Sequence, residues 1–171
     1  MTTTTASQLS RLTLKSLKTV KWMSEETNCF TATVLLDGKT IGTAENDGHG
    51  GSTFVRFASV AAQETALAFA LSVLPADVAG WEFLSDTGFT FDDLVDLTVD
   101  RELKLKEIAS IRNKGIKYAA FITTKSTKGS FLKFKKVTDL EKCVAVAKAT
   151  VGFKQMVGDM TNEEIVAWFM S

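Results

Sequence analysis

The chain has 171 residues, of which 45% are hydrophobic, and this suffices for a globular fold with a buried core. Its formal net charge of +0 argues against both a uniformly basic nucleic-acid binder and a highly acidic DNA mimic. No run approaches the ~18 apolar residues of a membrane span, and the N-terminus lacks the pattern of a signal peptide. We therefore expect a cytoplasmic protein without a membrane segment.

The first half of the chain predicts an antiparallel sheet followed by a helix. We expect residues 1–10, which are rich in Thr and Ser, to be disordered. Strands are predicted at residues 12–22, 29–36 and 39–44. A largely buried helix that is rich in Ala and Phe is predicted at residues 57–74. Asp37-Gly38 lies between the second and third strands and is a strong signal for a two-residue hairpin turn. Pro75 follows the predicted helix, as is typical of a helix end.

The second half predicts three helices and a second hairpin. Thr90 and Asp93 form a capping pattern that opens a long helix ending near Lys114-Gly115. We expect two strands joined by a polar connection, at residues 116–124 and 130–137. Two further helices that begin with capping boxes are expected at residues 139–150 and 162–170. The predicted fold is therefore a single α+β domain in which two β-hairpins share an antiparallel sheet packed by several helices.

Charge is distributed unevenly along the chain. Residues 1–100 contain six Lys and Arg against 13 Asp and Glu, whereas residues 101–171 contain 14 against seven. The basic side chains are densest in residues 101–136. Such asymmetry is typical of a partner surface. The alternative is that the two halves neutralise one another within the monomer or across a homo-oligomer.

A Gly-rich loop at residues 46–51 is the strongest candidate site. Around a two-residue turn at Asp37-Gly38, Cys29 is predicted to face Asn46 and Thr27 to face Gly48. This pairing brings residues 24–27 beside residues 46–51 at the open end of the hairpin. The candidate residues are Glu25, Glu26, Asn46, Asp47, Gly48, His49, Gly50 and Gly51.

Two interpretations of this loop remain open. Its carboxylates and His49 are residue types that bind a divalent metal or act as acid and base, and glycine N–H groups favour an anion. Alternatively, Asn, Asp and Thr side chains cap the backbone, and His49 is structural. The Gly spacing matches neither a dinucleotide fingerprint nor a Walker motif, so we assign no catalytic residue and expect no cofactor.

The two cysteines are expected to be packed thiols. Cys29 and Cys143 are far apart in sequence, which argues against a disulfide framework and a CxxC zinc site. The predicted register places His49 several residues from Cys29, so a nucleophilic pair is disfavoured. Cys143 falls in an apolar helical stretch, where a buried side chain is the simpler interpretation.

The predicted second hairpin interleaves aromatic and basic residues. The candidate basic surface consists of Lys125, Lys128, Lys133, Lys135 and Lys136. Aromatic and basic residues alternate in this way on single-strand nucleic-acid platforms. The alternative is a half-buried strand with a solvated lysine edge, which prevents edge-to-edge aggregation.

One sequence pattern, at about residues 14–52, resembles that of a known family. It consists of Ser24-Glu25-Glu26-Thr27-x-Cys29-Phe30-x-Ala32, then Asp37-Gly38-Lys39-x-x-Gly42, then Asn46-Asp47-Gly48-His49-Gly50-Gly51. The pattern resembles a largely uncharacterised family of small bacteriophage and prophage proteins. The resemblance implies a phage accessory factor that acts by binding in the host-cell cytoplasm, in host takeover or anti-defence, and it assigns no role to any residue.

These observations lead to three functional hypotheses. The first is a non-enzymatic binding protein that engages a host protein through its charged second half or its Gly-rich loop. The second is nucleic-acid binding through residues 101–136. The third is a small-molecule- or metal-dependent enzyme that uses Glu25, Glu26, Asp47 and His49.

Overall fold

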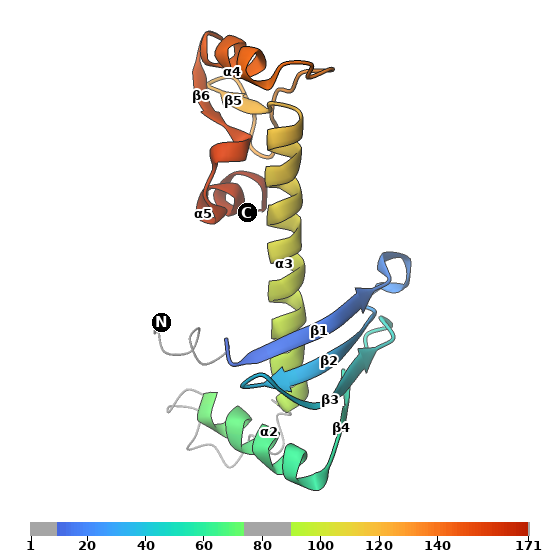
Figure 1. The fold of residues 1–171 in the computed structure, drawn as a ribbon. Helices are drawn as coiled ribbons and strands as arrows, with labels where there is room; N and C mark the ends of the chain where they lie inside the picture. The colour runs from blue at the N-terminus through green and yellow to red at the C-terminus, as the bar shows by residue number, and fades with distance from the viewer. Residues whose placement is uncertain (1–9, 74–89, 171) are drawn as a thin grey trace. The chain divides into compact units, whose positions relative to one another are not determined.

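A computed structural model describes residues 10–73 and 90–170 and confirms the α+β class. Contacts divide the chain into two compact units, Met1–Arg101 and Glu102–Ser171, which we call unit 1 and unit 2 and describe separately. Helix α3 contributes its first turns to unit 1 and its last turns to unit 2 (Figure 1). The predicted disorder of residues 1–10 falls almost entirely outside the described residues, and the single domain stays a prediction.

Unit 1 is a four-stranded antiparallel sheet with one buried face. It contains β1 (Leu12–Thr19), the 3-10 turn η1 (Lys21–Met23), β2 (Phe30–Leu36), β3 (Lys39–Asn46), β4 (Phe54–Phe57), α2 (Val60–Val73) and the start of α3 (Phe91–Lys117). The strand order is β1-β2-β3-β4, so each strand pairs with its neighbours in sequence. Burial alternates along β2, as expected for a sheet with one face in the core.

The Asp37-Gly38 turn is the predicted two-residue connection. Leu36 pairs with Lys39 across it, and the turn residues have φ values of 51° and 76°. Two positive φ values are the signature of a type I′ turn, whose twist matches that of the strands. Arg11 holds the turn in place, because its Nε and Nη2 donate to the two carboxylate oxygens of Asp37 at 2.8 and 2.7 Å.

The predicted register is wrong beyond the first two pairs. A bulge at Ile41 shifts the pairing by one residue, so that Asn46 pairs with Phe30 and not with Cys29. Ile41 is buried, and the extra residue lets its side chain reach the core. A pattern of alternating residues does not reveal a bulge, because the insertion depends on the packing against the sheet.

Two features differ from the prediction for residues 57–74. Residues 54–57 form β4, an edge strand that the sequence did not reveal, and α2 begins only at Val60. The predicted burial all round the helix is also wrong, because Val60, Leu67 and Leu71 are exposed and only the face that carries Phe69 is buried. Pro75 lies outside the described residues.

Helix α3 begins as predicted and ends later. Thr90 caps its start by donating its backbone N–H to the Asp93 carboxylate at 2.5 Å. The helix continues to Lys117, and Ala119 then takes the left-handed conformation, with φ 46°, that is typical of a helix end. The N–H of Ala120 then donates to the carbonyl of Gly115 at 2.8 Å and closes the helix end.

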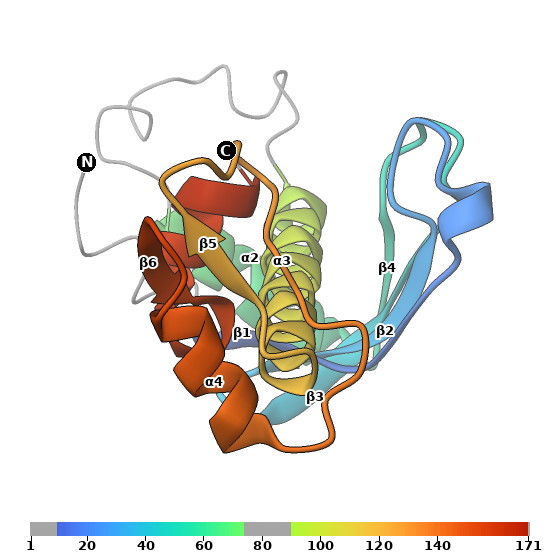
Figure 2. The same ribbon diagram turned by 90° about the horizontal axis from the view of Figure 1, so that it is seen from above.

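Unit 2 contains a small two-stranded sheet on one side of its part of α3 (Figures 1 and 2). Its elements after α3 are β5 (Phe121–Thr123), α4 (Leu140–Lys148), β6 (Phe153–Met156), η3 (Val157–Asp159), α5 (Asn162–Ile165) and the π-helix η4 (Val166–Met170). Two clusters of buried side chains stabilise it. The larger joins Ile108 of α3 to Ile122, Val157 and Ile165.

The second hairpin is the main error of the sequence prediction. Residues 130–137 form an irregular segment with one bridge, Phe121 to Leu132, and the partner of β5 is β6. The two predicted hairpins therefore do not share a sheet. Strand β6 is only four residues long and is distant in sequence from β5, so short-range patterns do not identify it.

One of the two predicted C-terminal capping boxes is confirmed. The box expected at the start of α4, between Thr138 and Glu141, is wrong, because Asp139 caps the helix alone by accepting from Lys142 N at 3.0 Å. Thr161 and Glu164 form the predicted capping box of α5. The predicted single helix over residues 162–170 is divided into α5 and the π-helix η4.

Candidate functional site

Asn46 organises the Gly-rich loop that follows β3. Its Oδ1 accepts from Gly48 N at 2.8 Å and from Thr27 Oγ1 at 2.9 Å, and its Nδ2 donates to the carbonyl of Gly51 at 3.0 Å and to Thr53 Oγ1 at 3.2 Å. The residue is only 7% exposed. All four bonds connect parts of the loop and its neighbouring turn, so the role of Asn46 is to fix the backbone.

Gly48 brings the two predicted segments together. Its carbonyl accepts from the backbone N–H groups of Glu25, Glu26 and Thr27 at 3.0, 3.1 and 3.4 Å. Its φ is +88°, and a Cβ at this position would overlap the carbonyl oxygen of Met23. Both requirements favour glycine. The predicted proximity of these segments is confirmed, although the strand register that suggested it is off by one.

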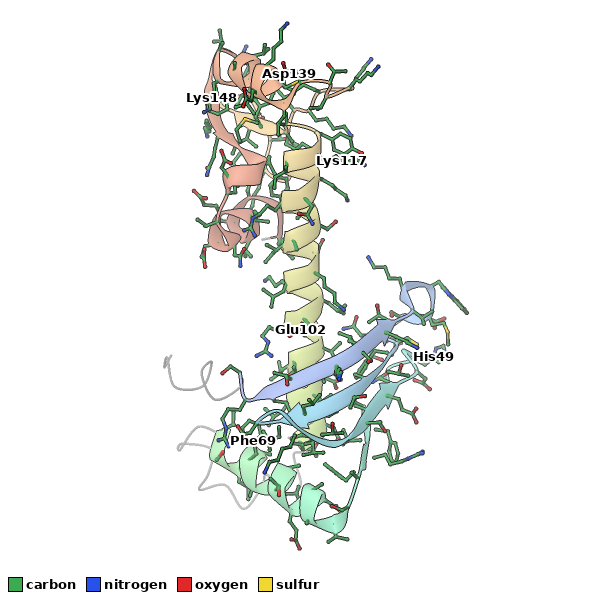
Figure 3. The ribbon with its side chains drawn as sticks, viewed as in Figure 1. His49, Phe69, Glu102, Lys117, Asp139 and Lys148 are labelled. Carbon is green, nitrogen blue, oxygen red and sulfur yellow. The ribbon has the colours of Figure 1, made fainter. Side chains whose placement is uncertain are left out.

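The four titratable groups of the predicted constellation do not converge on one point. His49 Nδ1 lies 3.4 Å from Glu25 Oε2, and both side chains are more than half exposed. The Glu26 carboxylate lies against Gly50, and the Asp47 carboxylate accepts from His49 N at 3.2 Å. Figure 3 shows His49 at the end of the sheet where β1 leads to β2 and β3 to β4. Across residues 10–73 and 90–170, no group of three His, Cys, Asp or Glu side chains has the geometry of a metal site.

The loop N–H groups are mostly occupied by side chains of the loop and of the adjacent turn. Gly48 N donates to Asn46, His49 N to Asp47, and Gly50 N to Thr27 Oγ1 at 3.3 Å. An anion-binding nest requires such groups to point at the ligand. The geometry therefore favours the scaffold interpretation of the loop.

An open hollow of about 500 Å³ lies beside the loop, on unit 1. Its floor includes a row of residues paired across the sheet, Lys18, Thr31, Glu45 and Phe54. Cys29 also lines it and is otherwise buried as a free thiol. Cys143 is a free thiol too, but it is half-buried at the edge of a core cluster.

A second, acidic hollow of about 370 Å³ on unit 1 includes two carboxylates that the sequence analysis did not select. Asp96 and Asp100 of α3 line it together with Glu25 and Glu26. Burial raises the pKa of Asp96, a hydrogen bond from Thr53 opposes this, and the neighbouring carboxylates raise the pKa further. Asp96 and Asp100 are four residues apart in the acidic run before residue 101. Residues with this spacing are neighbours on a helix, and this is the signal that was available in the sequence.

The predicted basic surface lies on an irregular segment of unit 2, not on a strand. Its side chains are all exposed, and they are Lys125, Lys128, Lys133, Lys135 and Lys136. Trp168 anchors this segment, because its Nε1 donates to the carbonyl of Ser130 at 3.0 Å and its carbonyl accepts from Gly129 N at 2.7 Å. The alternation that would place these lysines on two faces of a strand is therefore absent.

A basic face of α3 is the feature of unit 2 that the sequence analysis did not identify. A shallow hollow of about 480 Å³ runs along it, lined by Lys106, Ala109, Ser110, Asn113, Lys114, Lys117 and Tyr118. We call this set the α3 face. The spacings of three, four, seven, eight, eleven and twelve residues from Lys106 place these side chains on one side of the helix. Figure 3 shows Lys117 near the C-terminal end of α3.

Tyr118 connects the α3 face to the segment that carries Lys125, Lys128, Lys133, Lys135 and Lys136, which we call the lysine segment. The ammonium groups of Lys117 and Lys133 lie 5.3 and 5.1 Å from the centre of its ring. Both distances are within the range of a cation–π contact. Among the described residues, the ion pairs Arg11–Asp37 and His49–Glu25 do not involve the lysines of the α3 face, and no described carboxylate pairs with them.

No protein-family model matches the chain, and no curated protein or solved structure is significantly similar to it. Within the described parts of the chain, no helix has the length and apolar character needed to cross a membrane.

Proposed function

We propose that this protein is a binding protein whose unit 2 holds an acidic macromolecule on the α3 face. The observation that supports this proposal is the stripe of Lys106, Lys114 and Lys117 on one exposed side of the helix, with no described carboxylate paired to it. Solvated lysines without carboxylate partners attract a complementary acidic surface and increase its rate of association.

The charge of unit 2 agrees with this assignment. Residues 102–171 carry 13 Lys and Arg against seven Asp and Glu, although the whole chain is neutral. Of these acidic residues, only Glu102 and Glu107 lie on α3. The local field at the α3 face is therefore positive, and composition averaged over the chain does not reveal it.

The phage setting implied by the sequence resemblance is compatible with this proposal. A phage accessory factor that captures an acidic host macromolecule would use such a surface, and the segment with Lys133, Lys135 and Lys136 extends it beyond Tyr118. An enzyme at the Gly-rich loop is less well supported, because the loop donors bond to neighbouring side chains. We assign that loop a scaffold role.

The test is a titration of the wild type and of the variant Lys114→Gln/Lys117→Gln with polyglutamate. Polyglutamate is a flexible polyanion that carries no nucleobases. Each exposed charge pair contributes about 0.5–1 kcal/mol, so the double variant should bind about 5–30 times more weakly. The matched control is Lys142→Gln/Lys148→Gln, which removes two exposed charges from α4 of the same unit. Equal binding by both variants would refute the α3 face as the site.

The segment beyond Tyr118 is tested separately by reversing Lys133, Lys135 and Lys136 to Glu. We expect this variant to lose polyglutamate binding while its far-ultraviolet circular dichroism spectrum stays that of the wild type. Full retention of binding would exclude that segment and restrict the site to the α3 face.

A further inference from the structure

We propose that the acidic macromolecule is duplex DNA and that the α3 face between Lys106 and Lys117 enters its major groove. This inference rests on the proposed function and specifies its partner. Its basis is the shape and chemistry of one side of a helix, whose side chains are exposed over three turns.

The α3 face is unobstructed within unit 2. The opposite side of the same turns packs into the unit 2 core, with Ile108 only 4% exposed and Gly115 against the backbone of Gly158. An α-helix with its side chains is about 10–12 Å wide, and the major groove of B-DNA is about 12 Å wide. The width of the helix therefore matches the width of the groove.

The residues are arranged as such a contact requires. Along the helix, the short side chains of Ala109, Ser110 and Asn113 lie between Lys106 at one end and Lys114 and Lys117 at the other. Short side chains permit close approach to the base edges, where an Asn amide pairs with adenine N6 and N7. The lysines are then placed for phosphates, which fix the position of the helix without reading sequence.

The length of the face corresponds to about half a turn of the duplex. The eleven residue-to-residue steps from Lys106 to Lys117 rise about 16 Å along the helix axis, which equals about five base pairs of B-DNA. This is the span over which a helix follows the groove before the duplex curves away. Lys133, whose ammonium lies over the Tyr118 ring, adds a further cation at the end of this span.

Two other nucleic-acid partners fit less well. Single strands bind through exposed aromatic rings on which bases stack, whereas the one aromatic residue of the α3 face, Tyr118, is half-buried and lies within 5.3 Å of two ammonium groups. Duplex RNA has a deep and narrow major groove that side chains do not enter. Duplex DNA is therefore the partner that the geometry favours.

The experiment measures fluorescence anisotropy of the full chain with a labelled random-sequence DNA duplex over a range of salt concentrations. Single-stranded DNA, an RNA duplex and polyglutamate are titrated in parallel. We expect the duplex DNA to bind most tightly, and the slope of log K against log salt to become shallower by about 1.8 in Lys114→Gln/Lys117→Gln, since each phosphate contact contributes about 0.9. Lys142→Gln/Lys148→Gln should keep the slope.

Base contacts are tested by selecting bound sequences from the random duplex pool. We expect an adenine-containing motif that Asn113→Ala no longer enriches, because the amide that pairs with adenine has been removed. The matched control is Asn162→Ala, which removes an exposed amide from α5 of the same unit and should leave the motif unchanged.

Three outcomes of the anisotropy experiment separate this inference from the proposed function. Binding to duplex DNA that is no stronger than to single strands or duplex RNA would overturn the inference. Polyglutamate binding that depends on Lys114 and Lys117, without duplex binding, would overturn it while leaving the proposed function intact. No binding to any of the four would overturn both.

Discussion

Replacing Asn46 with Ala should destabilise unit 1, because this side chain connects four points around the Gly-rich loop. It is 7% exposed, and its four hydrogen bonds range from 2.8 to 3.2 Å. Each bond has a net value of about 1 kcal/mol, and a donor left buried without a partner costs more. Two of the partners, Thr27 and Gly51, are open enough to be rehydrated, whereas Gly48 and Thr53 are buried. We therefore expect a loss of about 3 kcal/mol.

The assay combines urea unfolding with hydrogen exchange measured by mass spectrometry. In Asn46→Ala, exchange should accelerate in peptides of residues 20–57 and stay unchanged in unit 2. His49→Ala is the matched control, because His49 is more than half exposed and a surface substitution changes stability by about 0.5 kcal/mol or less. If Asn46→Ala proved as stable as the wild type while His49→Ala was destabilised, the scaffold interpretation of the loop would be refuted.

Three further predictions concern single side chains. Gly115→Ala should destabilise unit 2 and accelerate hydrogen exchange there alone, because a Cβ would lie 2.7 Å from the backbone nitrogen of Gly158; exchange rates equal to the wild type would contradict the close approach. Thr161→Ala should cost about 1 kcal/mol in urea unfolding through loss of the capping box, and a change below about 0.3 kcal/mol would show that the cap contributes little. Asp96→Asn should raise the urea midpoint at neutral pH. Since the pKa of Asp96 is raised in the folded state, its ionisation above that pKa lowers stability, so the advantage of the variant should shrink as pH falls towards about 4; an advantage independent of pH would contradict this sign.

The elements determined by local chemistry could be predicted from the sequence. The type I′ turn at Asp37-Gly38 and the capping box at Thr161 need only residues that are neighbours in the chain, and both are present. The meeting of Glu25 and Glu26 with Gly48 followed from the same turn. Each of these predictions depended on short-range geometry.

The errors arise where packing decides the structure. The bulge at Ile41 serves the core of unit 1, and β5 pairs with β6 across about thirty residues, so neither is visible in a local pattern. The α3 face was missed for a different reason. A count of charges places its lysines in a long basic segment, and only the helical spacing of Lys106, Lys114 and Lys117 gathers them on one side of α3.

The anchoring of the lysine segment by Trp168 gives unit 2 an optical reporter of its own. The indole N–H is bonded to Ser130, and the Lys154 ammonium lies 5.7 Å from the ring centre, so the emission of this indole depends on whether the segment stays docked. Trp22, by contrast, is 83% exposed on unit 1. When Trp22 and Trp81 are replaced by Phe, Trp168 is the one emitting indole. Its spectrum then follows the lysine segment during titration with a partner, and no added label disturbs the lysines.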